Sequence, residues 1–167
     1  FIRSPLLPDP IMFGGGHENE RRAGTENLAA IAGFVTALEN LVRTPSFPSE
    51  RLLSMTKRLS ESIKRVAGAR LVGSQTHRLA NTVSFVVEGT DSFALLAGLD
   101  VEGICASAGA AYSAGSLEPS HVVTALGLNR DLARALVRFS LGRETTDQEV
   151  ACVAELLPGI IRRAQGR

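Results

Sequence analysis

Residues 105–120 read CASAGAAYSAGSLEPS, a run of small side chains with one aromatic ring, Tyr112, near its middle. Small residues allow a loop to approach another part of a structure closely. The apolar residues 103–106 before the run predict a short strand, and Pro119 after it predicts the start of a helix. A loop of this kind between two elements favours a segment that presents a residue or covers a site.

Size and composition indicate a soluble globular chain. The chain has 167 residues, of which 44% are apolar and 21% charged, enough for one compact domain with a fragment of a second. The net charge of +1 argues against bulk attraction to nucleic acid or membrane, and no apolar run reaches the length of a membrane span. Two cysteines form no disulfide framework, so we expect a cytoplasmic protein. A first residue that is not Met suggests a processed chain or a fragment.

The rest of the chain alternates helical and strand patterns, which favours an α/β fold with helices packed on a sheet. Helical spacing follows Thr25, the expected N-cap, and a second helix begins at Ser49 and ends at Gly68. Strands are expected over residues 70–73, 82–87, 103–106 and 136–140, with helices over 91–99 and 119–126. Residues 1–3 predict the end of a further strand. A capping box at Thr146 predicts a terminal helix, which Pro158 should kink or interrupt.

The segment before Thr25 combines three glycines, Arg21 and Arg22 with a hydroxyl at a predicted helix N-terminus. Free amides and the helix dipole favour an anion at such a place. Gly and Thr before a helix also act as simple capping residues, so chemistry alone leaves both interpretations open.

Arg138 lies between apolar residues of the last predicted strand, in VRFSLGR over residues 137–143. An arginine in this setting either faces solvent or pairs with an anion, because a buried guanidinium needs a partner. From the residues alone the two alternatives are equal.

The cysteine, lysine and histidine side chains are interpreted mainly as structural or solvent-exposed groups. Cys105 at the end of an apolar strand predicts a buried thiol, with a replacement nucleophile as the alternative, and Cys152 is core or surface filler in the last helix. Lys57 and Lys64 lie off the apolar face of their helix and are expected in solvent. His77 is expected in a loop and His121 at a helix start, and neither has the companions of a metal site, so no metal is expected.

Three motifs occur in the order found in one enzyme family. They are GGGHE followed by RAGTEN over residues 14–27, GICASAG with SLEPSHV over 103–122, and VRFSLGR over 137–143. This chain resembles the C-terminal part of the cysteine desulfurases, fold-type I pyridoxal-phosphate enzymes of the class V aminotransferase family, from Phe1 to about Ala154. The resemblance implies that residues 1–44 end the large cofactor-binding domain and that residues 45–167 form the small C-terminal α/β domain with its connecting helix.

The resemblance also implies roles for three residues. Thr25 would reach the phosphate of pyridoxal phosphate in the other subunit of a dimer, and His17 stands nearby where glutamine is usual. Arg138 would bind the α-carboxylate of an amino-acid substrate bidentately. Tyr112, which precedes Arg138 by 26 residues as the family's sulfur-accepting cysteine does, stands at the position of that cysteine.

Sulfur transfer through Tyr112 is not expected, because a phenol cannot hold sulfur as a persulfide. The lysine that anchors the cofactor lies upstream of the matching segment in the family, so the cofactor is expected only with a lysine-bearing part. The implied function is the C-terminal portion of a desulfurase-like enzyme that acts on an amino acid. The alternative is an inactive homologue that serves in dimerisation or partner binding. The implied partners are a second copy, a complementing N-terminal half, and a sulfur acceptor or scaffold protein.

Overall fold

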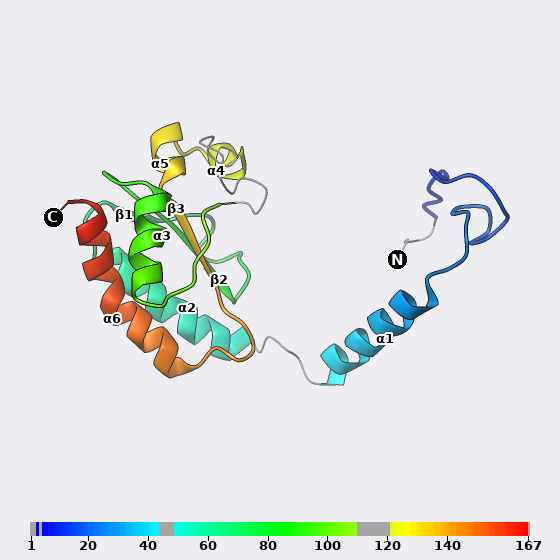
Figure 1. Ribbon diagram of the computed structural model, residues 1–167, viewed down its shortest axis with the longest axis horizontal. Coiled ribbons are helices and arrows are strands. Elements are labelled where there is room, and N and C mark those ends of the chain that lie inside the picture. Colours follow the sequence, from blue (N-terminus) through cyan, green and yellow to red (C-terminus); the bar gives the residue numbers. More distant parts are fainter. Residues whose placement is uncertain (1–2, 4, 44–48, 110–120, 167) are drawn as a thin grey trace. The chain divides into compact units, whose positions relative to one another are not determined.

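The computed structural model describes residues 3, 5–43, 49–109 and 121–166, and the chain divides into two compact units, Phe1–Pro45 and Ser46–Arg167. Figure 1 shows the helices and strands of each unit. Tyr112, Pro119 and most of the strand expected over residues 1–3 lie outside the described residues. The predicted α/β class is confirmed by the second unit, which contains helices and a three-stranded sheet.

The first unit consists of a loop segment followed by helix α1, Leu28–Arg43. A bridge between Met12 and Arg22 closes the loop, and the amide of Ala23 donates to the carbonyl oxygen of Met12 at 3.2 Å. The side chain of Asn27 accepts a hydrogen bond from the amide of Ala30 at 3.0 Å. Asn27 therefore caps α1, and the prediction that Thr25 does so is wrong by two residues, because the asparagine side chain takes the capping role.

The apolar face predicted for α1 exists in sequence but is not buried within the described residues. Its helix has no buried residue, and its stripe lies exposed along the first unit: Leu28, Ile31, Val35, Leu38 and Val42. A helix of this kind gains little stability from its own unit, since the apolar area stays in water.

The second unit is built on a sheet of three antiparallel strands in the order β1-β2-β3. The strands are β1 (Ala69–Leu71), β2 (Thr82–Val87) and β3 (Leu136–Ser140). Ser84 of β2 pairs with Arg138 of β3, and Thr82 pairs with Ser140. Alternation along β2 and β3 therefore sends Val83, Phe85, Val137 and Phe139 to one face and Ser84 with Arg138 to the other.

The first face of the sheet carries the main core. Helices α2 (Ser49–Lys64), α3 (Ser92–Val101) and α6 (Asp147–Ala164) cover it, and α6 packs beside both α2 and α3, as Figure 1 shows. Phe85 and Phe139 stack there with ring centroids 5.8 Å apart. The apolar stripe predicted for α2 is confirmed, since all of its members are buried: Leu52, Met55, Leu59, Ile63 and Val66.

Within the part of the chain that the structure describes, the other face of the sheet is covered only at one end. Short helices α4 (His121–Ala125) and α5 (Arg130–Arg134) lie there. They contribute to a small separate cluster with the strands and the segment after β1: Val72, Val86, Val123, Ala133 and Leu136. Beyond this cluster the polar positions Ser84 and Arg138 follow on the same face.

Two sequence expectations around residue 105 are wrong. Residues 103–106 form no strand, and the segment contacts the sheet instead through a single antiparallel bridge between Ser107 and Arg138. Cys105 is exposed, because without a full strand its side chain is not held against the core.

Helix α2 ends at Lys64, four residues before Gly68, which takes a φ of +80° in the turn that leads to β1.

Helix α6 begins with the predicted capping box. The hydroxyl of Thr146 accepts from the amide of Glu149 at 3.2 Å, and the carboxylate of Glu149 accepts from the amide of Thr146 at 2.7 Å. Pro158 was expected to kink or interrupt this helix, and it does not interrupt it, since α6 continues through it to Ala164.

The continuity of α6 at Pro158 has a visible cause. Proline has no amide hydrogen, so the carbonyl of Ala154, four residues earlier, loses its intrahelical donor. The hydroxyl of Ser62, a buried residue of α2, donates to that carbonyl oxygen at 2.5 Å. A side chain from the neighbouring helix thus replaces the hydrogen bond that proline removes.

Candidate functional site

A pocket of about 350 Å³ opens on the partly covered face of the sheet in the second unit. Strand residues Thr82, Ser84 and Arg138 contribute its polar base, and Gly109 borders it. Its apolar wall comes from the segment after β1, from α4 and the residue that follows it, and from β3: Val72, Val122, Val123, Leu126 and Leu136. An apolar pocket with a few convergent polar groups suits a small ligand that has a polar head.

Arg138 reaches this pocket from the middle of β3. Its backbone is fixed on both sides, because it pairs with Ser84 of β2 and exchanges two hydrogen bonds with Ser107, at 2.8 and 3.0 Å. The side chain is half-buried, and Nη1 donates to the carbonyl oxygen of Gly109 at 3.2 Å. Its Nε is buried and has no hydrogen-bond partner among the described residues. The guanidinium is therefore held in place while its hydrogen-bonding capacity is only partly used.

The pocket contains a second arginine that sequence reasoning missed. Arg78 lies in the loop before β2, and its Nη2 donates to the carbonyl oxygen of Thr82. Its Nε is also buried without a partner in the described part of the chain. The lack of a strand or helix pattern around Arg78 left no local signal, and only the return of the loop to the sheet places it beside the pocket.

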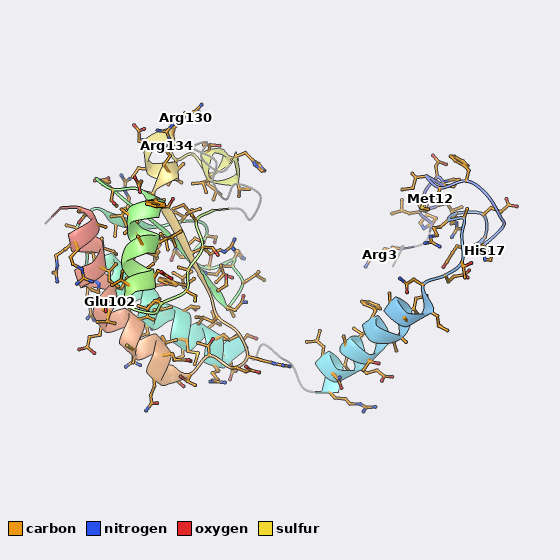
Figure 2. All side chains as sticks on the ribbon, in the orientation of Figure 1. Arg3, Met12, His17, Glu102, Arg130 and Arg134 are labelled. Atoms are coloured by element: carbon orange, nitrogen blue, oxygen red, sulfur yellow. The ribbon has the colours of Figure 1, made fainter. Side chains whose placement is uncertain are left out.

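Thr25 lies in the first unit, in a loop held by its own side chains. Arg22 Nη1 donates to the carbonyl oxygens of Gly24 and Thr25, both at 3.0 Å. His17, labelled in Figure 2, lies with Nδ1 3.1 Å from Oε1 of Glu26. Hydrogen bonding to its own backbone amide and then to His17 lowers the pKa of the Glu26 carboxyl. Glu26 is therefore an anion, and it reduces the positive field that Arg22 creates here.

The loop around Thr25 fits a contact with a phosphate but not the whole of pyridoxal phosphate. The side chain of Thr25 is exposed, and no described residue bonds to its hydroxyl, which leaves that group available as a donor. The sequence contains two lysines, Lys57 and Lys64, and both are exposed on α2, as predicted. The residues present could therefore hold the phosphate, but they offer no enclosed lysine as a covalent anchor.

The two cysteines line a different pocket, of about 530 Å³, on the side of the sheet where α6 packs. Cys105 and Cys152 are both free and exposed. Glu102, labelled in Figure 2 at the end of α3, also borders this pocket, and its Oε1 accepts from Nη2 of Arg163 at 2.6 Å. Within residues 3, 5–43, 49–109 and 121–166, no three His, Cys, Asp or Glu side chains gather closely enough to hold a metal.

The predicted site residues thus fall into three places. Arg138 faces a pocket in the second unit, Thr25 lies in the loop of the first unit, and Tyr112 lies outside the described residues. His77 lies in a loop that borders the Arg138 pocket, and His121 begins α4, so both of their predicted locations are confirmed.

Comparison with known proteins gives consistent matches. A family model described as aminotransferase class-V matches residues 14–153. A cysteine desulfurase IscS of Methanosarcina thermophila is 38% identical over 163 residues, which are 98% of this chain and 40% of that protein. A cysteine desulfurase IscS of Dictyoglomus turgidum is 35% identical over 164 residues, which are 98% of this chain and 42% of that protein.

Solved structures agree with this match. A NifS-like protein of Rickettsia africae superposes with a TM-score of 0.71 at 28% identity, over 93% of this chain and 40% of its own. A second NifS-like protein gives a TM-score of 0.78 at 26% identity, over 98% of this chain and 41% of its own. The chain therefore spans about 40% of the length of the relatives it matches. None of the described helices is both long and apolar enough to cross a membrane.

Proposed function

Because this chain belongs to the class-V aminotransferase family, we propose that it forms the C-terminal part of a cysteine desulfurase-like enzyme that binds an amino acid through Arg138. In this proposal residues 1–44 complete the large domain and residues 45–167 form the small domain. The observation that carries it is the placement of a partly satisfied guanidinium in a pocket with apolar walls.

Arg138 is suited to hold a carboxylate for chemical reasons. A guanidinium stays protonated at all ordinary pH values and presents parallel donors that match the two oxygens of a carboxylate. The backbone of Arg138 is tied to both Ser84 and Ser107, so binding loses little freedom at this residue. The apolar wall beside it excludes water and strengthens the charge-assisted bonds. The role of this residue is to bind and orient the substrate.

Thr25 is proposed to contact the phosphate of pyridoxal phosphate, in the subunit opposite its own within a homodimer. Its exposed hydroxyl supports this assignment, as does the loop that Arg22 holds through two carbonyl oxygens. Pyridoxal phosphate, when bound, serves as an electron sink for bonds at the α-carbon of an amino acid. The lysine that anchors it would come from a part of the enzyme outside these 167 residues.

Tyr112 is proposed to stand where the family's sulfur-accepting cysteine stands, so that sulfur transfer at this position is absent. A phenol oxygen cannot take the sulfur of a substrate as a persulfide, and it ionises only near pH 10. A sulfide-release assay on this chain combined with a lysine-bearing polypeptide tests the point. With dithiothreitol present to reduce a persulfide to sulfide, we expect sulfide from L-cysteine with Y112C and none with the unchanged chain, and release by the unchanged chain would overturn the assignment.

The test of the carboxylate role compares L-alanine with L-alaninamide, which lacks the carboxylate. We expect L-alanine to shift the NMR resonances of the pocket and L-alaninamide to leave them unchanged. Arg138→Gln should weaken L-alanine binding by roughly tenfold or more, and Arg138→Lys by less, since it keeps the charge but not the fork. R58Q, a change of an exposed arginine on α2, is the matched control. Equal binding of both compounds would contradict the proposal.

A further inference from the structure

The pocket around Arg138 holds a second guanidinium that the proposed carboxylate contact does not use. Arg78 comes from the loop between β1 and β2, and it lines the same pocket as Arg138. Its Nη2 donates to the carbonyl oxygen of Thr82, at the first position of β2. This bond fixes the end of the arginine side chain against the sheet.

The sheet supplies a backbone contact for each of the two arginines. Arg78 is anchored at Thr82, and Arg138 pairs across the sheet with Ser84, two positions farther along β2. A small molecule with acidic groups at both ends matches a pocket whose lining carries an arginine from each of two segments.

Among the described lining residues, no acidic side chain balances the two arginines of the pocket. Its described lining contains Arg78 and Arg138 and neither aspartate nor glutamate. Ion pairs elsewhere in the described chain involve other basic residues, Arg70, Arg143 and Arg163 among them. Both pocket arginines are half-buried, and both have a buried Nε without a described partner. Two cations that line one pocket and lie partly out of water favour a ligand that brings two negative charges.

Polar groups beside Arg78 also favour a ligand with a polar, negatively charged end. His77 and Ser74 border the pocket from the same loop. The Ser74 hydroxyl accepts a hydrogen bond from the amide of His77 at 2.9 Å, which fixes the turn next to Arg78. This loop thus adds polar groups to the pocket at a place other than the polar base on the strands.

We propose that Arg78 binds a second acidic group, so that the pocket selects an amino acid with an acidic side chain. The α-carboxylate lies on Arg138 and the side-chain acid lies on Arg78. This inference rests on the proposed function, because it takes the Arg138 contact as its starting point. Arg78 also braces the loop through Thr82, but a brace alone affects all ligands equally and gives no selectivity.

The experiment uses L-glutamate and L-glutamine, which have the same length and differ by one charge at neutral pH. The 167-residue chain is titrated with each compound, and dissociation constants are measured by NMR. We expect L-glutamate to bind roughly tenfold more tightly than L-glutamine. R78Q should remove this difference and leave L-glutamine binding within about threefold of its original value, whereas R138Q should weaken both compounds. R58Q is the control that removes an exposed arginine elsewhere.

The outcomes separate this inference from the proposed function. Equal binding of the two amino acids by the unchanged chain, with loss of both in R138Q, overturns the role of Arg78 and leaves that of Arg138. Binding of neither amino acid overturns both. If R78Q does not fold, R78M serves instead: a lost preference for L-glutamate with intact L-glutamine binding supports the role of Arg78, and a retained preference contradicts it.

Discussion

Ser107 and Arg138 exchange both of their backbone hydrogen bonds, with the amide of Arg138 2.8 Å from the carbonyl oxygen of Ser107 and the reverse pair at 3.0 Å. This bridge joins the start of the small-residue loop to the strand that carries the pocket arginine. A contact of two residues thus replaces the strand that the sequence predicted over residues 103–106. The backbones of Ser107 and Arg138 are therefore positioned by the same pair of bonds.

Replacing Ser107 by proline should therefore affect both stability and ligand binding. Proline removes the amide that donates to Arg138, and we expect a loss of about 1–3 kcal/mol in the free energy of unfolding. L-Alanine should also bind more weakly, because Arg138 loses one of its supports. Ser107→Ala keeps the backbone bonds and is the control in denaturant titrations and NMR. Equal stability of the two variants would show that the bridge contributes little.

The effects of substitutions at Ser62 and Pro158 on the free energy of unfolding should be coupled. In the unchanged chain, Ser62→Ala leaves the carbonyl of Ala154 without its donor and should cost about 1–3 kcal/mol. In a Pro158→Ala background, the amide of residue 158 can donate to that carbonyl, so the same serine change should cost less than about 1 kcal/mol. Urea unfolding of the four proteins in this cycle gives the coupling energy. Ser54→Ala, at an exposed serine of α2, is the control, and additive effects would contradict the explanation.

The capping box of α6 predicts a dependence of stability on pH. Hydrogen bonds from the amide and then the hydroxyl of Thr146 lower the pKa of the Glu149 carboxyl. A carboxyl whose pKa is lower in the folded state stabilises the fold above its unfolded pKa, and that stabilisation disappears as pH falls through the folded pKa. Between about pH 6 and pH 3, Glu149→Gln should therefore lose less stability than the unchanged chain.

Thermal or denaturant unfolding across this range measures the difference. Glu155→Gln removes another exposed carboxylate from the same helix and should leave the pH dependence closer to that of the unchanged chain. Thr146→Ala should lower stability by about 1 kcal/mol at neutral pH, since it removes the N-cap. A pH profile of Glu149→Gln that parallels that of the unchanged chain would exclude the carboxylate as the source.

The sequence predicted secondary structure best where the local hydrophobic pattern agrees with the packing of the fold. Strands β2 and β3 were predicted to the residue, because alternating apolar residues such as Val83 and Phe85 match the buried face of the sheet. The stripe of α2 was predicted for the same reason. The cap of α1 was misplaced, since Thr25 and Asn27 are both good caps and local chemistry does not choose between them.

The remaining errors depend on contacts between distant residues. Pro158 was expected to kink or interrupt α6, and no local signal shows that Ser62, on another helix, supplies the missing donor that lets α6 continue. Arg78 was missed as a pocket residue because its position follows from the path of a loop. For Arg138, the residues around it left two equal alternatives, exposure to solvent or pairing with an anion. Only the family resemblance assigned it to a carboxylate, so its binding role stays a prediction.

The two faces of strands β2 and β3 have different roles. Val83, Phe85, Val137 and Phe139 bury one side against the long helices, while Ser84 and Arg138 face the pocket on the other. Substitutions at Ser84 and Arg138 can therefore alter the pocket without disturbing the side chains that bury the main core. A descendant of this chain could change what the pocket binds through such positions and inherit the scaffold intact.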